Sequence, residues 1–220
     1  MFDLCIVPEH DNLRPRDNVV HSVGALNRVL PGTQRDPKLA MILLGGPSRH
    51  HAWEQDILFA QIRQLVTTKT SLDWLIASSP RTPEAIMRAL SALDHVQLVR
   101  FENTASDWLP EKLARASLVW VSEDSMSMAY EALSSGATTG LLAVNAQGLG
   151  DNSGEARNQG KSAKRSGDRL ATAIQTLRES GRVIATKQWL EGQPLRTSSE
   201  PLREADRCAR QILERWPDLQ

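Results

Sequence analysis

A short run of hydroxyl and carboxyl residues near the middle of the chain has the types and spacing to hold a nucleotide. Ser125 and Ser127 lie at the start of a helix predicted over 125–135, where free backbone N–H groups attract anions. Glu131 follows about one and a half turns later, within reach of a ribose attached to a phosphate at the helix start. The pattern therefore predicts a diphosphate and ribose site. The alternative is that Ser125 or Asp124 only caps the helix.

Two further groups of residues follow predicted strands and precede predicted helices. Paired glycines let a backbone approach a phosphate closely, and hydroxyls beside an always-charged arginine can bind one. The first group is Gly45, Gly46 and Ser48, and the second is Ser79, Arg81 and Thr82. We expect both groups to contact the same substrate. Each also fits a plainer role, the first as a tight turn and the second as a solvated cap with Thr82 before Pro83.

A histidine between two carboxyl residues, Glu9-His10-Asp11, is a candidate general base with two candidate catalytic neighbours. The alternative is a polar turn after the first predicted strand. His50 and His51 are adjacent in the chain and so point in different directions, and no cluster of Cys, His or acidic residues has the spacing of metal ligands. The sequence thus predicts neither a metal nor a cofactor, and any catalysis by this chain is expected to proceed without them.

These groups need a scaffold that brings strand ends together, and the hydrophobic pattern predicts one. Between residues 40 and 144, short apolar runs alternate with helical patterns. Strands are predicted over 40–46, 72–78, 96–101, 117–123 and 139–144, and helices over 53–68, 83–93, 106–115 and 125–135. This alternation is typical of an α/β fold, a Rossmann-like parallel sheet with helices on both faces.

A loop rich in turn-forming residues, 31–38, indicates a domain boundary. We expect a remnant of an N-terminal Rossmann-like domain over 1–37, a C-terminal Rossmann-like nucleotide-binding domain over 38–198 and a C-terminal helix over 199–220.

Three features are predicted after the last strand of the alternation. A glycine-rich surface loop is expected over 145–166, followed by a helix over 167–180. The last helix is expected to run from about 199 to 215. Its predicted apolar face consists of Leu202, Ala205, Ala209, Ile212 and Leu213.

The charge balance argues against some classes of protein. The 220 residues include 26 Lys and Arg and 26 Asp and Glu, so no overall field favours nucleic acid or an anionic membrane. No apolar stretch approaches the roughly 20 residues of a membrane span. Cys5 and Cys208 lie far apart and match no metal or redox spacing, which indicates a reducing compartment, and we expect the cytoplasm. The basic residues among 161–169 could contact a phosphate or a lipid headgroup, or they could simply form a solvated charged loop.

Several of these motifs, taken in order, resemble the mitochondrial-fission ELM family of plants and its bacterial homologues. The resemblance rests on Pro8-Glu9-His10-Asp11, Gly45-Gly46-Pro47-Ser48, Ser79-x-Arg81-Thr82 and the run from Ser122 through Ser125, Ser127 and Glu131 to Gly136. It implies a GT-B-like fold, the two-Rossmann architecture of many glycosyltransferases and of sugar-nucleotide 2-epimerases. By this resemblance, Glu131 meets the ribose and the serine-bearing helix start meets the diphosphate.

The resemblance also implies that most of an N-terminal Rossmann-like domain is missing, and Pro80 stands where a second arginine is expected. The predicted function is a GT-B-like protein that binds a nucleoside diphosphate sugar, with metal-independent glycosyl transfer as a candidate activity. Two alternatives stay open. One is a non-catalytic adaptor that acts through a protein partner, as the plant relatives are implied to do, and the other is a truncated domain without activity. A peripheral contact with a membrane is open as well.

Overall fold

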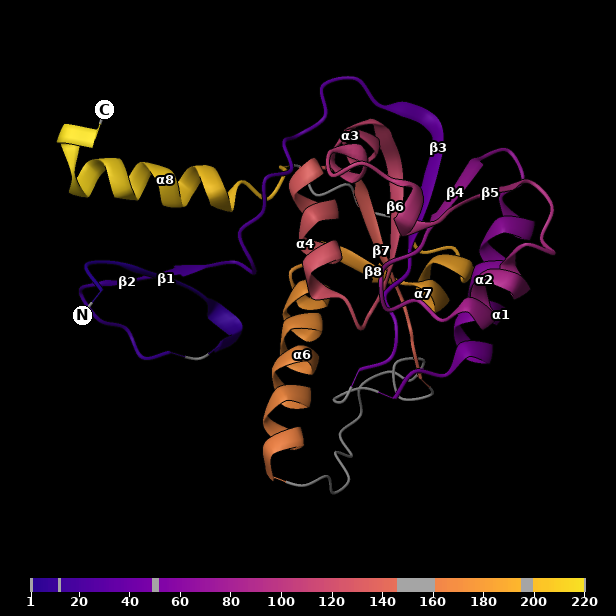
Figure 1. Ribbon diagram of the computed structural model, residues 1–220, viewed down its shortest axis with the longest axis horizontal. Helices are drawn as coiled ribbons and strands as arrows, with labels where there is room; N and C mark the ends of the chain where they lie inside the picture. Colours follow the sequence, from indigo (N-terminus) through magenta and orange to yellow (C-terminus); the bar gives the residue numbers. More distant parts are fainter. Residues whose placement is uncertain (1, 12, 49–51, 146–160, 195–199, 220) are drawn as a thin grey trace.

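The computed structural model describes residues 2–11, 13–48, 52–145, 161–194 and 200–219, with the backbone alone for 161–169. Its main body is built on a six-stranded sheet in which every pair of neighbouring strands is parallel (Figure 1). The strands are β3 (Asp36–Leu43), β4 (Asp73–Ala77), β5 (Val96–Val99), β6 (Ala116–Ser122), β7 (Thr138–Leu142) and β8 (Val183–Ala185). Their order in the sheet is β5-β4-β3-β6-β7-β8, which is the Rossmann order and confirms the predicted fold class.

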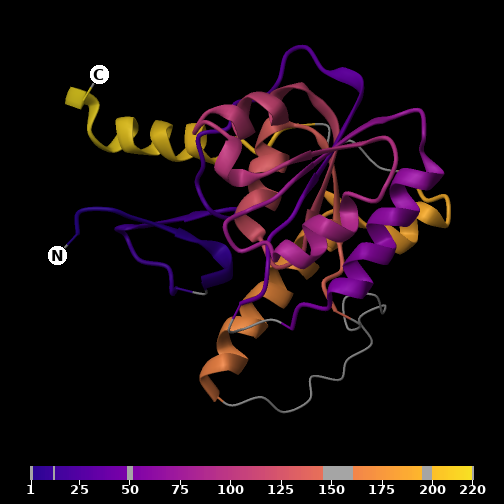
Figure 2. The same ribbon diagram turned by 45° about the vertical axis from the view of Figure 1, so that its right-hand side comes forward.

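Helices cover both faces of this sheet, which is why its strands read as continuous apolar runs. On β3, Met41 and Leu43 face one core, whereas Ala40 and Ile42 face the other. The first core is closed by α3 (Trp108–Arg115), α4 (Met126–Ser135) and α6 (Lys161–Glu179), and the second by α1 (Gln55–Thr68), α2 (Glu84–Leu90) and α7 (Thr186–Leu190). Figures 1 and 2 show these two layers on opposite sides of the sheet.

A smaller body stands beside the main one and joins the two ends of the chain. It contains a two-stranded parallel sheet of β1 (Cys5–Pro8) and β2 (Val19–Ser22), with the 3-10 helix η1 (Glu9–Asp11) between them. Helix α8 (Glu204–Arg215) and the 3-10 helix η3 (Pro217–Leu219) lie next to this sheet in both views (Figures 1 and 2). The division of the chain at residues 37 and 198 stays a prediction.

The structure moves several predicted boundaries. Strand β3 starts at Asp36 rather than at residue 40, and β5 ends at Val99 before the 3-10 helix η2 (Phe101–Asn103). The predicted cap at Thr82 is wrong, because α2 begins at Glu84 with Pro83 as its N-cap residue. Strand β8 and helix α7 were not predicted, since a strand of three residues is too short to show a period.

The C-terminal third departs most from expectation. Helix α6 begins at Lys161, so the predicted loop over 145–166 extends too far; residues 146–160 lie outside the described part. The first residues of α6 lack apolar periodicity, but the lysines, alanine and arginine among them favour a helix. Helix α8 begins at Glu204, and its predicted apolar face is shifted, because Ala205 and Ala209 are exposed while Cys208 is buried. Among the helices within the described residues, none has the length and apolar character needed to cross a bilayer.

Candidate active site at the strand-order reversal

The candidate site lies where the order of the sheet reverses, between β3 and β6. From these neighbouring strands the chain continues toward opposite edges of the sheet, and ligands of Rossmann-like proteins bind beyond the carboxyl ends of such a pair. The loop after β3 carries Gly45 and Gly46, and the loop after β6 leads through Asp124 into α4. We call the carboxyl ends of β3, β4 and β6, with the first turn of α4, the switch-point edge.

The two glycines bring the protein's own groups together. Gly45 N–H donates to the Ser122 hydroxyl oxygen at 2.8 Å, and Gly46 N–H donates to an Asp124 carboxylate oxygen at 2.8 Å. A Cβ atom on Gly45 would lie 2.0 Å from Asp124 Oδ2, and one on Gly46 would lie 1.9 Å from the Arg81 carbonyl oxygen. The turn therefore requires glycine at both positions. Contact of these glycines with a phosphate stays a prediction, and both amides already have acceptors within the protein.

Ser79 and Thr82 brace this turn from the end of β4. The Thr82 hydroxyl lies 2.9 Å from the Leu44 carbonyl oxygen and 2.7 Å from that of Gly45, and it accepts the Ser79 N–H at 2.8 Å. The Ser79 hydroxyl donates to the Gly45 carbonyl oxygen at 3.2 Å. Both side chains are half-buried, whereas Ser48 is exposed after the turn. The second predicted group thus lies against the first.

Helix α4 begins at this edge without a side-chain cap. Ser125 is its N-cap residue, and its hydroxyl makes no capping hydrogen bond. The carboxylate of Asp124 is bound by Gly46, Arg81 and Trp53 instead of by the first turn of the helix. Ser127 is the second residue of the helix, in its first turn, and is exposed. Capping therefore does not account for these residues, and the first-turn N–H groups stay available to a ligand.

Two carboxyl groups near α4 have perturbed acidity. Glu131 is half-buried, and burial raises the pKa of its carboxyl, opposed by the charge of Arg28. Glu123 is buried, and burial raises its pKa to about 7, with the nearby Asp124 acting in the same direction and Arg178 opposing. Arg178, from α6, forms an ion pair with Glu123. Neither arginine was singled out from the sequence, since both lie far along the chain from their carboxyl partners.

The predicted base is brought to the same helix. η1 lies against α6, and the His10 ring stacks on Tyr130 of α4 with centroids 6.3 Å apart and planes 7° apart. His10 is half-buried, while Glu9 and Asp11 are exposed. Tyr130 directly precedes Glu131, so the structure places His10 next to the helix that carries Ser127 and Glu131. A catalytic role for Glu9, His10 and Asp11 stays a prediction.

In the described part of the chain, the switch-point edge contains no candidate metal site and no cysteine thiol. Within those residues, no three His, Cys, Asp or Glu side chains form a group that could hold a metal ion. Cys5 and Cys208 are free thiols, half-buried and buried respectively. His50 and His51 lie outside the described residues, as do the side chains of the basic residues among 161–169.

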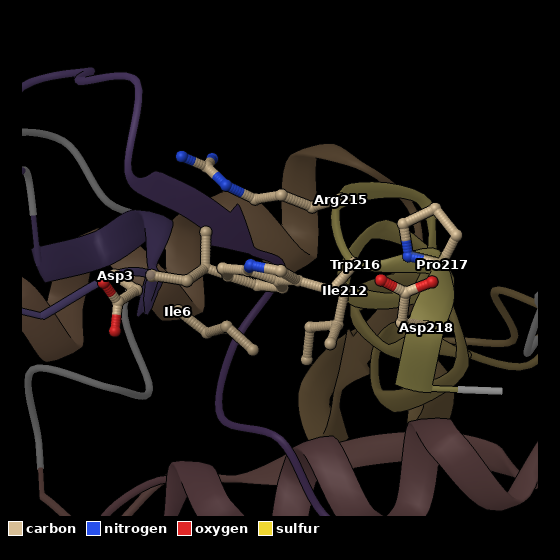
Figure 3. A pocket seen from close by; sticks show the side chains of 8 residues that line it. Asp3, Ile6, Ile212, Arg215, Trp216, Pro217 and Asp218 are labelled. Atoms are coloured by element: carbon tan, nitrogen blue, oxygen red, sulfur yellow. The ribbon is translucent and has the colours of Figure 1, made fainter.

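A cavity of ≈ 610 Å³ lies away from this edge, in the smaller body (Figure 3). It is bounded by Ile6 of β1, Ile212 of α8 and Trp216, with Asp3, Arg215 and Asp218 around them. None of the predicted site residues lines it, so it belongs to the packing of the two chain ends rather than to the switch-point edge.

The strand order and the loops at its reversal define a Rossmann-like α/β protein. The family follows from the sequence. The model of the mitochondrial fission ELM1 family matches residues 1–216, and the chain belongs to that family. The resemblance drawn from the motifs is thereby confirmed. No curated protein matches the sequence.

Solved structures similar to this chain include a glycosyltransferase and an epimerase. The pneumococcal O-GlcNAc transferase GtfA, in complex with UDP and GlcNAc, is 15% identical with a TM-score of 0.49, and the match covers 99% of this chain and 44% of that one. A putative UDP-N-acetylglucosamine 2-epimerase from Listeria monocytogenes is 14% identical with a TM-score of 0.42, over 83% of this chain and 46% of that one. This chain therefore spans less than half the length of either protein.

Proposed function

We propose that this chain binds a nucleoside diphosphate sugar at the switch-point edge, as the C-terminal part of a GT-B-like protein. The observation that carries the proposal is the start of α4, which lies at the strand-order reversal, lacks a side-chain cap and exposes Ser127. The diphosphate accepts hydrogen bonds from the first-turn N–H groups and from Ser125 and Ser127. Glu131 accepts hydrogen bonds from the ribose hydroxyls.

The charges at this edge are compatible with an anionic ligand. Glu123 and Asp124 bring two carboxyl groups close to the proposed diphosphate, which taken alone would oppose its binding. Each is paired with an arginine, Glu123 with Arg178 and Asp124 with Arg81. Because each carboxylate is neutralised by its arginine, the positive end of the α4 dipole is the charge that attracts the ligand.

Glycosyl transfer is the candidate activity of the complete protein. Without a metal, departure of the diphosphate relies on the N-terminus of α4 and on Arg81, which stabilise the charge that develops on the leaving group. His10 acts as the general base toward the acceptor, from its position beside α4. The chain spans less than half the length of the similar transferase. Binding of the acceptor and its activation by His10 are therefore proposals for the protein as a whole.

The proposal is tested by thermal unfolding of the purified chain with UDP, GDP, ADP and CMP and their sugar conjugates. A ligand at about 100 times its dissociation constant should raise the free energy of unfolding by roughly 2.7 kcal/mol. We expect a nucleotide-selective shift that Ser127→Ala and Glu131→Gln both reduce. The matched controls are Ser71→Ala, exposed before the amino end of β4, and Glu214→Gln, exposed on α8, which should keep the shift.

Absence of a shift with every nucleotide would contradict the proposal. The family description then favours the other class of function, an adaptor that keeps the fold as a scaffold and acts through a protein partner. A shift that Ser127→Ala and Glu131→Gln leave intact would place the nucleotide elsewhere on the chain.

A further inference from the structure

We propose that Asp124 is a positioning residue, whose buried carboxylate holds the Arg81 guanidinium and the start of α4 in the geometry that a diphosphate needs. This inference rests on the proposed function, because it concerns the same ligand. Asp124 has no place in the predicted site except as a helix cap, and the structure does not use it as one.

The carboxylate of Asp124 is fully enclosed and bound on several sides. Its side chain is 0% exposed, and it accepts hydrogen bonds from Gly46 N–H at 2.8 Å, from Trp53 Nε1 at 3.3 Å and from Arg81 at 3.1 Å. A buried carboxylate is tolerated only when it is paired and hydrogen-bonded in this way. The lack of space for a Cβ atom at Gly45 shows that the turn after β3 closes directly on this carboxylate.

Arg81 is in the opposite situation, anchored at two points but open to solvent. One of its terminal nitrogens donates to the Gly46 carbonyl oxygen at 2.8 Å and the other to Asp124 at 3.1 Å, while its side chain is 43% exposed. These bonds occupy two of the five N–H donors of a guanidinium. The anchoring fixes the plane of the group, and the remaining donors can meet a phosphate oxygen.

The same carboxylate also sets the helix in place. Asp124 directly precedes Ser125, the N-cap residue of α4, and so links the helix start to the loops after β3 and β4. An arginine and a helix N-terminus that are already oriented lose less conformational entropy when the ligand binds. The carboxylate therefore acts on the diphosphate through Arg81 and α4 rather than by contact.

The test compares the binding of UDP and of uridine by calorimetry, since only UDP carries the diphosphate. We expect Asp124→Asn to weaken UDP binding about tenfold, because the neutral amide loses the charge-assisted bond to Arg81, and to leave uridine binding unchanged. Arg81→Ala should weaken UDP binding to a similar degree. The double variant should lose less than the sum of the two single losses, because Asp124 acts partly through Arg81 and partly through α4.

Glu84→Gln serves as the matched control. Glu84 also pairs with an arginine, Arg100, at a helix start on the same edge of the sheet, but both side chains are exposed. This variant should bind UDP as the unchanged chain does. If Asp124→Asn does not fold, Arg81→Lys replaces it: lysine keeps the charge but loses the two-point anchor, so we expect weaker UDP binding with uridine binding retained.

The outcomes separate the two ideas. If the unchanged chain binds neither UDP nor GDP nor ADP, the proposed function and this inference both fail; if it binds GDP or ADP instead of UDP, the same comparison is made with that nucleotide and its nucleoside. If it binds UDP and Asp124→Asn binds equally well, only this inference fails. Equal losses for UDP and uridine mean that Asp124 supports folding alone, and additive losses in the double variant mean that it does not act through Arg81; either result overturns the positioning role.

Discussion

The buried Glu123 and Arg178 pair shows how burial and charge compete at a single residue. Burial raises the pKa of Glu123 to about 7, even though the positive charge of Arg178 acts in the opposite direction. The ordinary pKa of the group is 4.5. Between pH 4.5 and about pH 7, the Glu123 carboxyl therefore keeps its proton in the folded protein and loses it in the unfolded chain. The free energy of unfolding falls as the pH rises through this window, because the folded state binds more protons.

We expect Glu123→Gln to remove this dependence. Relative to the unchanged chain, the variant should gain about 2 kcal/mol in the free energy of unfolding between pH 5 and pH 8, whatever its offset at pH 5. Urea unfolding at several pH values measures the difference. Glu84→Gln is the control, since the pKa of Glu84 is lowered by its bond to Arg100 and it does not titrate in this window. Parallel curves for Glu123→Gln and the unchanged chain would contradict the prediction.

Helix α4 is the element that carries the proposed site, and its two ends are built differently. Its start is uncapped by a side chain, whereas its end is closed by Gly136 in the left-handed conformation, with φ 77. Arg35 donates to the Ser135 carbonyl oxygen at this end, and Leu202 N–H donates to that of Leu133 at 3.1 Å. The closed end holds the helix in place, so the open end can serve a ligand.

Gly136→Ala should destabilise the fold more than Gly181→Ala. Both glycines have positive φ, but a Cβ atom on Gly136 would lie 3.0 Å from Pro201 and 3.1 Å from Arg35, while nothing lies within 4 Å at Gly181. We expect a loss of about 1 kcal/mol at Gly181, from the backbone alone, and of about 2 kcal/mol or more at Gly136. Equal losses in denaturant unfolding would show that packing at Gly136 adds nothing.

The whole molecule is organised as two bodies, and both ends of the chain lie in the smaller one. The smaller body is held together by α8, where Glu204 accepts the Val23 N–H at 2.8 Å and Arg207 donates both to Glu204 and to the His21 carbonyl oxygen. A two-stranded sheet has little stability of its own, so β1 and β2 depend on these contacts. η1, between the two strands, lies against the main body through α6 and Tyr130.

Glu204→Ala should therefore loosen the smaller body without affecting the six-stranded sheet. We expect hydrogen exchange at Val23 and along β1 and β2 to become about tenfold faster, while β3 and β6 keep their protection. Asp206→Ala is the control, because Asp206 pairs with the neighbouring Arg203 on the exposed side of α8. Faster exchange across both sheets would mean that the two bodies unfold together.

Local patterns were enough to predict the α/β class and a helix that ends at residue 135, just before Gly136. Apolar runs, helical periods and a terminal glycine depend on neighbouring residues, so they can be recognised in the sequence. The three loops that meet at the switch-point edge were also predicted, because parallel strands bring their carboxyl ends to one edge. Where the start of α6 and the strand β8 were missed, the local signal was weak or too short.

The partners of the site residues were decided by the tertiary structure alone. The sequence predicted Asp124 as a possible helix cap. In the structure β3 and β6 are neighbours, and the Asp124 carboxylate binds Gly46, Trp53 and Arg81. Buried parallel strands all appear as similar apolar runs, so the sequence is compatible with many strand orders. Each order would bring different loops together. The choice is made by packing between segments far apart in the chain, which no local pattern records.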